Sequence, residues 1–345
     1  GAADLVEEVI RIHGIDNVPA VALPKLSGVA RPVMTSGQKR VRRARRILAE
    51  RGMTEAITWS FITQDEAAHF GGGAPALKLS NPISSEMSDM RPSLLPGLLL
   101  ATGRNVDRSQ RAPALFEIGQ TFADDTPQGQ TTRAAGVRAS GVARSWSQAA
   151  GGAEPDLFTV KADALATLEA AGLDTAKLQV SRDVPAWFHP GRAGALQLGP
   201  RVKLGYFGEV HPSTLTALDV KGPVYAFELD LALIPAPKKK GRGRGALDLV
   251  DLQPVRKDLA FAVDADVAAG DIVRAALSAD KKLITGAQVF DIFTGASLDE
   301  GKKSVAIEVT LQPTTDTMSD EDIDGVISAI ADKVAKATGG EVRGR

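Results

Sequence analysis

Apolar residues recur every three or four positions in several segments of the chain, which is the pattern of amphipathic helices. The clearest segments span residues 3–13, 38–51, 156–171 and 269–278. A fifth segment follows Ser319, and its apolar stripe consists of Ile323, Val326, Ile327, Ile330 and Val334. Ser36 is the candidate N-cap of the second helix, and Gly14 and Gly52 end the first two. The pattern therefore predicts a helix in each of these segments.

Between these helices, apolar and polar residues alternate as they do in strands with one buried face. The segments 54–63, 115–122, 134–143 and 223–231 show this alternation, and residues 193–210 predict a hairpin that turns at Gly199 and Pro200. Shorter helices are predicted at residues 96–101, where Pro96 suits the first turn, and at residues 212–218. Residues 33–234 thus predict a mainly antiparallel sheet with helices, an α+β fold.

A stretch of proline, glycine and like charge at residues 235–245 marks the plainest domain boundary, with the basic Gly-rich linker at 238–245. The segments 258–264, 284–293, 303–312 and 341–343 beyond it predict strands. Together with the helices at 269–278 and after Ser319, they give the order β-α-β-β-α-β, which is the ferredoxin-like arrangement. That fold hosts many functions, RNA binding among them, so it implies no single one.

Composition narrows the class of protein without naming a function. A length of 345 residues predicts two or three domains, and 43% hydrophobic with 24% charged residues is typical of soluble globular proteins. Lys plus Arg number 41 against 42 Asp plus Glu, so any surface that attracts nucleic acid must be local. The absence of cysteine excludes disulfides and thiolate sites and fits a cytoplasmic protein. No apolar run is long enough for a membrane span, so we expect no membrane partner.

Motifs of known catalytic chemistry are missing from the sequence. It has no GxxxxGK[ST] loop, no GxGxxG after a strand, no HExxH and no GxSxG. The four histidines, His13, His69, His189 and His211, are scattered, and the last two precede prolines as turn residues do. We therefore predict no catalytic residues in this chain.

Two helices carry charge patterns with more than one interpretation. Asp4, Glu7 and Glu8 lie within one turn, so their oxygens could converge on magnesium, although the spacing alone favours a solvated helix face. The helix at 38–51 is densely basic through Lys39, Arg40, Arg42, Arg43, Arg45 and Arg46. This basic face is either solvated or turned to an acidic partner, or it contacts phosphates, and the sequence leaves the choice open.

The last domain combines aromatic residues with cations, as RNA-binding sheets do. Phe261, Phe290 and Phe293 lie in predicted strands, and in so small a domain we expect each to be core rather than a stacking surface. The better RNA-binding candidates are the cations Arg256, Lys257, Lys281, Lys282, Lys302 and Lys303.

Several longer segments resemble one family in collinear order along the whole chain. They read DLVEEVIRIHGIDNVP, LSNPISSEMSDMRPSLLPGLL, FEIGQTF, WFHPGRAG, GYFGEVHPSTLTALDVKGPVYAFELDL and PVRKDLAF. Together they look like the bacterial phenylalanyl-tRNA synthetase β subunit. The resemblance is far more specific than any single motif above. Because Gly1 opens a helix already under way, we expect the chain to be a C-terminal fragment.

The resemblance implies three domains. Residues 1–27 would end a helical, winged-helix-like magnesium-binding domain, and residues 28–237 would form a class II synthetase core-like domain. Residues 246–345 would be a ferredoxin-fold anticodon-binding domain. Class II cores hold ATP with arginines in two segments that correspond here to residues 114–117 and 227–230, and neither contains arginine. The core-like domain is therefore expected to be non-catalytic.

The resemblance also implies partners and a cofactor. In the family, the α subunit uses ATP to activate phenylalanine, and the β subunit holds α and tRNA(Phe) in an (αβ)2 heterotetramer. Asp4, Glu7 and Glu8 match the family's Mg²⁺-binding acids, although a further Asp six positions before Asp4 is missing here. The upstream editing domain is also missing. The rival hypotheses are a stand-alone RNA-binding scaffold and an independent aminoacylating enzyme.

Overall fold

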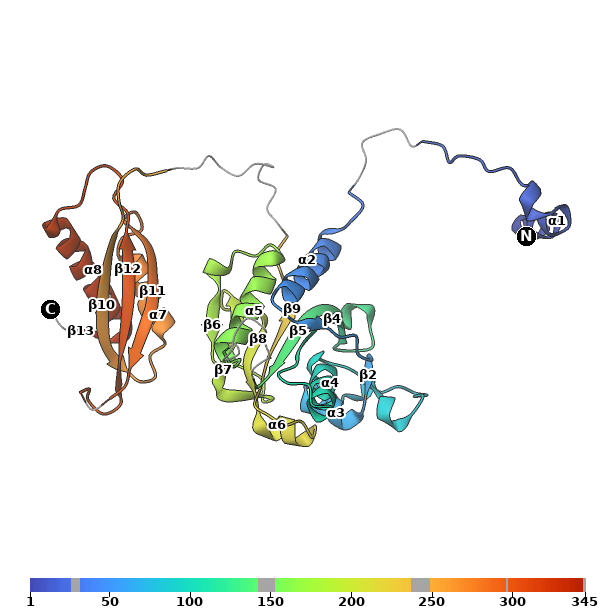
Figure 1. Ribbon diagram of the computed structural model, residues 1–345, viewed down its shortest axis with the longest axis horizontal. Helices are drawn as coiled ribbons and strands as arrows, with labels where there is room; N and C mark the ends of the chain where they lie inside the picture. The colour runs from blue at the N-terminus through green and yellow to red at the C-terminus, as the bar shows by residue number, and fades with distance from the viewer. Residues whose placement is uncertain (26–31, 142–152, 237–248, 296, 344–345) are drawn as a thin grey trace. The chain divides into compact units, whose positions relative to one another are not determined.

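The computed structural model describes residues 1–25, 32–141, 153–236, 249–295 and 297–343 (Figure 1). The chain divides into two compact units, residues 1–236 and 237–345. The predicted linker at 238–245 lies outside the described residues. Among the described residues, no helix has the length and apolar character needed to cross a membrane.

The first unit is built on a seven-stranded sheet with the order β1-β4-β5-β9-β8-β7-β6. Its strands are β1 (Thr54–Glu55), β4 (Ala114–Phe122), β5 (Gln130–Ala139), β6 (Gln179–Ser181), β7 (Phe188–Leu198), β8 (Val202–Val210) and β9 (Val224–Asp230). Only β1 pairs in parallel, with β4, and the other pairs are antiparallel. The predicted α+β fold and the hairpin turn between β7 and β8 are confirmed.

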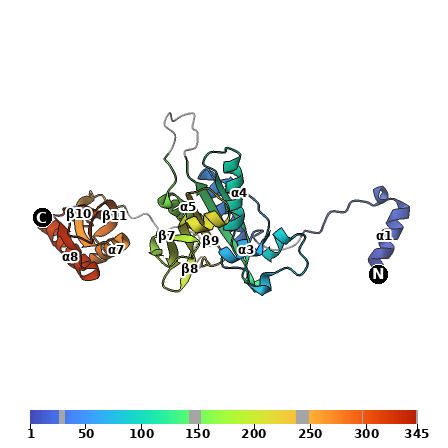
Figure 2. The same cartoon turned by 90° about the horizontal axis from the view of Figure 1, so that it is seen from below.

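Helices cover both faces of this sheet. On one face, α2 (Ser36–Glu50) and α5 (Leu157–Ala170) bury Leu48 and Leu168 against Phe116 and Phe227. On the other face, α4 (Leu95–Asp107) buries Leu98, with α3 (Gln64–His69) nearby (Figure 2), and α6 (Pro212–Ala217) adds Leu215 to the same core. Pro96 lies in the first turn of α4 as predicted, and the helix runs six residues beyond Ala101, to Asp107.

The predicted strand at residues 54–63 is wrong in its middle. Only β1 and β2 (Phe61–Ile62) are strands, and β2 pairs with β3 (Asp89–Met90) in a separate small sheet. Between them the chain leaves one sheet for the other, and Ile57 and Trp59 are 91% and 68% exposed. The alternation of apolar residues here therefore does not mark a buried face.

The second unit has the predicted β-α-β-β-α-β order. It consists of β10 (Val255–Asp264), α7 (Ala269–Ala279), β11 (Ile284–Phe293), β12 (Lys302–Leu311), α8 (Asp320–Thr338) and β13 (Glu341–Arg343). The strand order is β11-β12-β10-β13, which puts β11 at an edge. Phe261, Ile307 and Val309 from the central strands pack with Ile330 and Val334 of α8.

The remaining elements belong to no sheet. Helix α1 (Ala2–His13) has no buried residue. Five 3-10 turns complete the description, η1 (Ile15–Asn17), η2 (Pro75–Leu77), η3 (Ser85–Met87), η4 (Pro127–Gly129) and η5 (Thr175–Lys177).

The N-cap of α2 is Thr35, one residue before the predicted Ser36. The Thr35 hydroxyl accepts the Gln38 amide at 3.2 Å, and the Gln38 side chain accepts the Thr35 amide at 2.8 Å, so the two residues form a capping box.

The two residues should respond differently to mutation. Thr35→Ala removes the cap and should lower the free energy of unfolding by about 1 kcal/mol. Ser36→Ala leaves the box intact and should change it little. Denaturant unfolding of both variants measures the difference, and an equal loss from the two would contradict this assignment of the cap.

Candidate functional site

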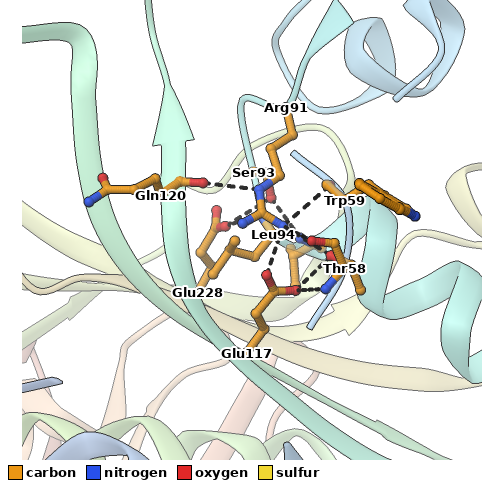
Figure 3. Close-up of polar contacts among 9 residues, drawn as sticks. Thr58, Trp59, Arg91, Ser93, Leu94, Glu117, Gln120 and Glu228 are labelled. Carbon is orange, nitrogen blue, oxygen red and sulfur yellow. Dashed lines mark hydrogen bonds and ion pairs between the residues drawn. The ribbon is translucent and has the colours of Figure 1, made fainter. Parts of the chain in front are cut away.

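A buried ion pair lies where the chain enters α4 above the sheet (Figure 3). Arg91 Nη1 donates to Glu117 Oε1 at 2.8 Å, and each side chain is only 5% exposed. The other carboxylate oxygen accepts the Thr58 hydroxyl at 2.6 Å and the Thr58 amide at 3.3 Å. Burying two charges is costly unless their remaining hydrogen-bonding groups are satisfied, and Thr58 does this for Glu117.

Arg91 also joins three segments of backbone. Its Nε donates to the carbonyl of Gln120 at 3.0 Å, and Nη1 donates to the Thr58 hydroxyl at 3.0 Å. The Trp59 carbonyl lies 3.5 Å from Nη1. The guanidinium thus fixes the irregular segment after β1 and the end of β4 relative to the start of α4.

A second buried carboxylate, Glu228 of β9, receives the start of α4. Its Oε1 accepts the Leu94 amide at 2.7 Å and the Ser93 hydroxyl at 3.0 Å. Its Oε2 accepts Arg133 Nη1 at 3.0 Å. The first amides of a helix lack partners and carry partial positive charge, so a carboxylate here is favourable. Arg133 in turn balances the charge of Glu228.

This arrangement leaves little room for a nucleotide. The cavity beside Arg133 and Glu228, also lined by Lys203 and Tyr206, holds about 110 Å³. Ligand pockets usually span roughly 300–1,000 Å³. Arg91 is buried in its pair with Glu117, and Arg133 is paired with Glu228. The chemistry available here is structural ion pairing.

Sequence reasoning missed this network. The segments at residues 114–117 of β4 and 227–230 of β9 do lack arginine. Arg133 nevertheless reaches the sheet face of Glu117 and Glu228, because its strand β5 lies between β4 and β9. Arg91 precedes Pro92 in a segment that carries no catalytic motif. Its partner Glu117 is 26 residues away, and no local pattern joins the two.

The second unit places its six candidate cations in two groups. Arg256, Lys257, Lys281 and Lys282 lie near the end of the sheet where Val255 and Ile284 pair with Leu311. Lys302 and Lys303 begin β12 at the opposite end, roughly 30 Å away at the rise of a strand. Lys302 is 3.5 Å from Asp264, and Lys303 donates to the Ala265 carbonyl at 2.9 Å. The six cations do not form one patch.

The prediction that all three phenylalanines are core is right for one and wrong for two. Phe261 is fully buried, whereas Phe290 and Phe293 are 56% and 44% exposed. Both exposed rings lie on the edge strand β11, and a break in its register between Val289 and Asp291 falls at Phe290. A central strand is covered and an edge strand is not, so burial differs although the local sequences look alike.

The charged helices of the first unit meet few partners. Glu8 pairs with Arg11 at 2.6 Å, and Asp4 contacts the amino group of Gly1. Nowhere in the described parts of the chain do three acidic or histidine side chains converge as a metal site would need, and Asp4, Glu7 and Glu8 stay apart in this structure.

The basic face of α2 is partly neutralised. Arg45 pairs with Glu55 at 2.6 Å, Arg46 lies 3.5 Å from Glu50, and Arg40 donates to the Pro235 carbonyl at 2.6 Å. These contacts lower the repulsion along the helix without deciding what its exposed cations face.

His189 and His211, which are scattered in the sequence, lie close together in the structure. The rings of His189 and His211 stack with centroids 6.2 Å apart. Each Nδ1 accepts a backbone amide, from Gly191 and Ser213 respectively, at 3.1 Å. The predicted turn role fits His211, which is the N-cap of α6, whereas His189 lies within β7.

Comparisons with known proteins place both units. Residues 21–231 match the family model described as the phenylalanyl tRNA synthetase beta chain CLM domain. Residues 251–343 match the ferredoxin-fold anticodon binding domain. The pyrrolysyl tRNA synthetase of Desulfitobacterium hafniense has a similar solved structure, with 15% identity and a TM-score of 0.42 over 56% of this chain and 64% of that one.

The fold and the two domains define a protein of the aminoacyl-tRNA synthetase class. The chain belongs to the phenylalanyl-tRNA synthetase beta chain family. A protein named phenylalanine–tRNA ligase beta subunit from Brucella abortus is 54% identical over all of this chain, and its namesake from Rhodopseudomonas palustris is 51% identical. The chain spans 43% of the length of each of these relatives.

The buried pair should be sensitive to the loss of one partner. Arg91→Met leaves Glu117 buried without its counter-ion and should lower the free energy of unfolding of the first unit by about 3–5 kcal/mol. The double variant Arg91→Met/Glu117→Met removes both charges and should recover much of that loss.

Arg46→Met is the matched control, because it breaks an exposed pair with Glu50 and should have little effect. Denaturant unfolding of the three variants gives the comparison. Equal stabilities of Arg91→Met and Arg46→Met would show that the buried pair does not hold the fold.

Proposed function

We propose that this chain is the non-catalytic C-terminal part of the β subunit of a phenylalanine–tRNA ligase, supporting ATP-dependent attachment of phenylalanine to tRNA(Phe). The network around Arg91 supports this proposal most directly. It buries Arg91 against Glu117, pairs Arg133 with Glu228, and leaves a cavity of only about 110 Å³ beside Arg133. In this proposal a partner α subunit uses the ATP, and the core-like domain supplies a frame for assembly.

The assembly is proposed to be an (αβ)2 heterotetramer in the cytoplasm. Ile57 and Trp59, exposed between β1 and β2, offer apolar surface of the kind that protein interfaces cover. Magnesium is proposed only for the longer protein, where Asp4, Glu7 and Glu8 would be joined by further ligands, because these three do not converge by themselves.

Two measurements test the scaffold role. Mixed with α subunit, the chain should elute from a sizing column as a larger complex than either component alone. By itself it should give no ATP–pyrophosphate exchange above background. Exchange by the chain alone would instead support an independent aminoacylating enzyme. Normal tRNA binding without any complex with the α subunit would favour the stand-alone RNA-binding scaffold.

The ferredoxin-fold unit is proposed to bind tRNA through its cations, with exposed Phe290 and Phe293 available for base stacking. Arg256, Lys257, Lys281 and Lys282 would contact phosphates at one end of the sheet. Lys302 and Lys303 would do so at the other end. A single bound strand can cross a sheet in this way, so two separate groups are compatible with one RNA.

Charge reversal tests this surface. Lys302→Glu/Lys303→Glu should weaken tRNA binding and reduce the slope of log affinity against log salt by roughly 1.4–1.8, because two phosphate contacts are lost. Lys333→Glu/Lys336→Glu on the exposed side of α8 is the matched control and should leave the slope nearly unchanged. Filter binding over a salt series gives both values. Equal effects of the two double variants would reject the strand-end surface.

A further inference from the structure

A second, larger cavity lies in the first unit, where β7, β8 and β9 meet the short helix α6. Its volume is about 410 Å³, within the range of pockets that hold small organic ligands. Of the residues around Arg91 in Figure 3, none lines it, so it is distinct from the network above.

The polar wall of this cavity is formed by side chains from three adjacent strands. Arg192 Nη1 donates to both carboxylate oxygens of Glu209, at 2.9 and 2.7 Å. Tyr225 pairs with Glu209 across β8 and β9. The hydrogen bond and negative charge of Glu209 raise the pKa of Arg192, while burial and the same carboxylate raise the pKa of Tyr225. At neutral pH the wall thus presents a guanidinium and a phenol.

Glu209 fixes the guanidinium without using all of its donors. The Glu209 side chain is 7% exposed and the Arg192 side chain is 56% exposed. Among contacts of the described residues, Nη1 is the only atom of the Arg192 side chain that makes hydrogen bonds. Its Nε and Nη2 therefore keep their N–H groups for a ligand. A guanidinium held in this way is pre-oriented, which lowers the entropy cost of binding.

Most of the other residues that line the cavity are apolar. Val210, Leu215, Val220 and Pro223 line it, with Thr216 of α6 exposed beside them. Such a wall favours the hydrocarbon part of a ligand, since burial removes apolar surface from water.

The charges select the kind of anion. Arg192 is already paired with the buried carboxylate of Glu209. A dianion such as phosphate would therefore be repelled by Glu209. A carboxylate carries one charge, and its two oxygens match the planar fork of a guanidinium. We propose that this cavity binds a small molecule with an apolar body and one carboxylate, held by Arg192.

Two sources share this chemistry, a free apolar amino acid and a carboxylic acid without the amine. Leucine and 4-methylpentanoate represent them with the same hydrocarbon body and carboxylate. Both oxygens of Glu209 already accept hydrogen bonds from Arg192. We therefore expect binding to require the carboxylate of the ligand rather than its amine. The relative affinity of the two probes identifies the source.

The sequence provides a built-in reporter, because Tyr206 and Tyr225 are its only two tyrosines and only Tyr225 lines the cavity. With 3-fluorotyrosine at both positions, the full chain should give two ¹⁹F signals, which Tyr225→Phe assigns. Titration with 4-methylpentanoate or leucine should shift the Tyr225 signal to saturation and leave that of Tyr206 in place. The uncharged 4-methylpentanamide is the ligand control and should bind at least about tenfold more weakly.

Two variants separate binding from folding. Arg192→Gln/Glu209→Gln removes the guanidinium together with its buried partner, so no uncompensated charge remains, and should weaken binding about tenfold or more. Thr216→Phe places a ring at the apolar wall from an exposed position and should also abolish the shift. Lys203→Gln/Asp183→Asn, which removes an ion pair outside the cavity, is the matched control and should bind normally.

Four results would overturn the proposal. They are the absence of a saturable shift with either acid, equal binding of the amide, movement of both tyrosine signals, and undiminished binding by the Arg192/Glu209 double variant. Each of these can occur whether or not the chain assembles with an α subunit, so the outcome is independent of the proposed scaffold function.

Discussion

The first unit depends on two carboxylates that are buried on one face of its sheet. Glu117 and Glu228 are 4% and 3% exposed, so each needs positive charge and hydrogen-bond donors at close range. These donors come from the segment around Thr58 and from the start of α4, as well as from β5. The requirement to satisfy the two carboxylates therefore ties irregular segments to a regular sheet.

The same requirement keeps the Arg91 guanidinium away from solvent and from ligands. A catalytic arginine must be free to contact a phosphate, whereas Arg91 is only 4% exposed and divides its donors among Glu117, Thr58 and Gln120. Replacing a buried ion pair by apolar residues is often neutral for stability, so the value of such a network can lie in specifying one arrangement. Here that arrangement is the approach of α4 to the sheet.

The ferredoxin-like unit was predictable because its strands alternate regularly and its helices follow local capping rules. Ser319 caps α8, the helix that the apolar stripe after it predicts, and Phe261 is buried. Local rules failed where a distant partner decides the outcome. Phe290 resembles a core residue in sequence, but no pattern within β11 says that the strand lies at an edge.

The first unit shows the same limit for its site. Its strands and helices could be predicted from periodicity, and the absence of arginine in two segments could be read directly. The pairing of Arg91 with Glu117 could not be predicted, because it follows from the crossing of β4 beneath the start of α4. Residues 56–60 failed for a related reason, since Thr58 turns toward Glu117 where alternation predicts a continuous strand.

Positive charge has two uses in this chain. Among the described residues of the first unit, four of the five buried carboxylates, Glu117, Asp163, Glu209 and Glu228, are each paired with arginine, and Asp89 is the exception. Asp163 is fully buried and takes two, Arg51 at 2.5 Å and Arg138 at 2.6 Å. In the second unit, Arg256 is 68% exposed, and its 4.0 Å approach to Glu308 neutralises it weakly. A cation that is paired with an internal carboxylate cannot attract RNA at long range, whereas an exposed cation can. Near-neutral total charge thus conceals two uses of arginine, because some side chains neutralise buried carboxylates of the first unit while others, such as Arg256, stay exposed.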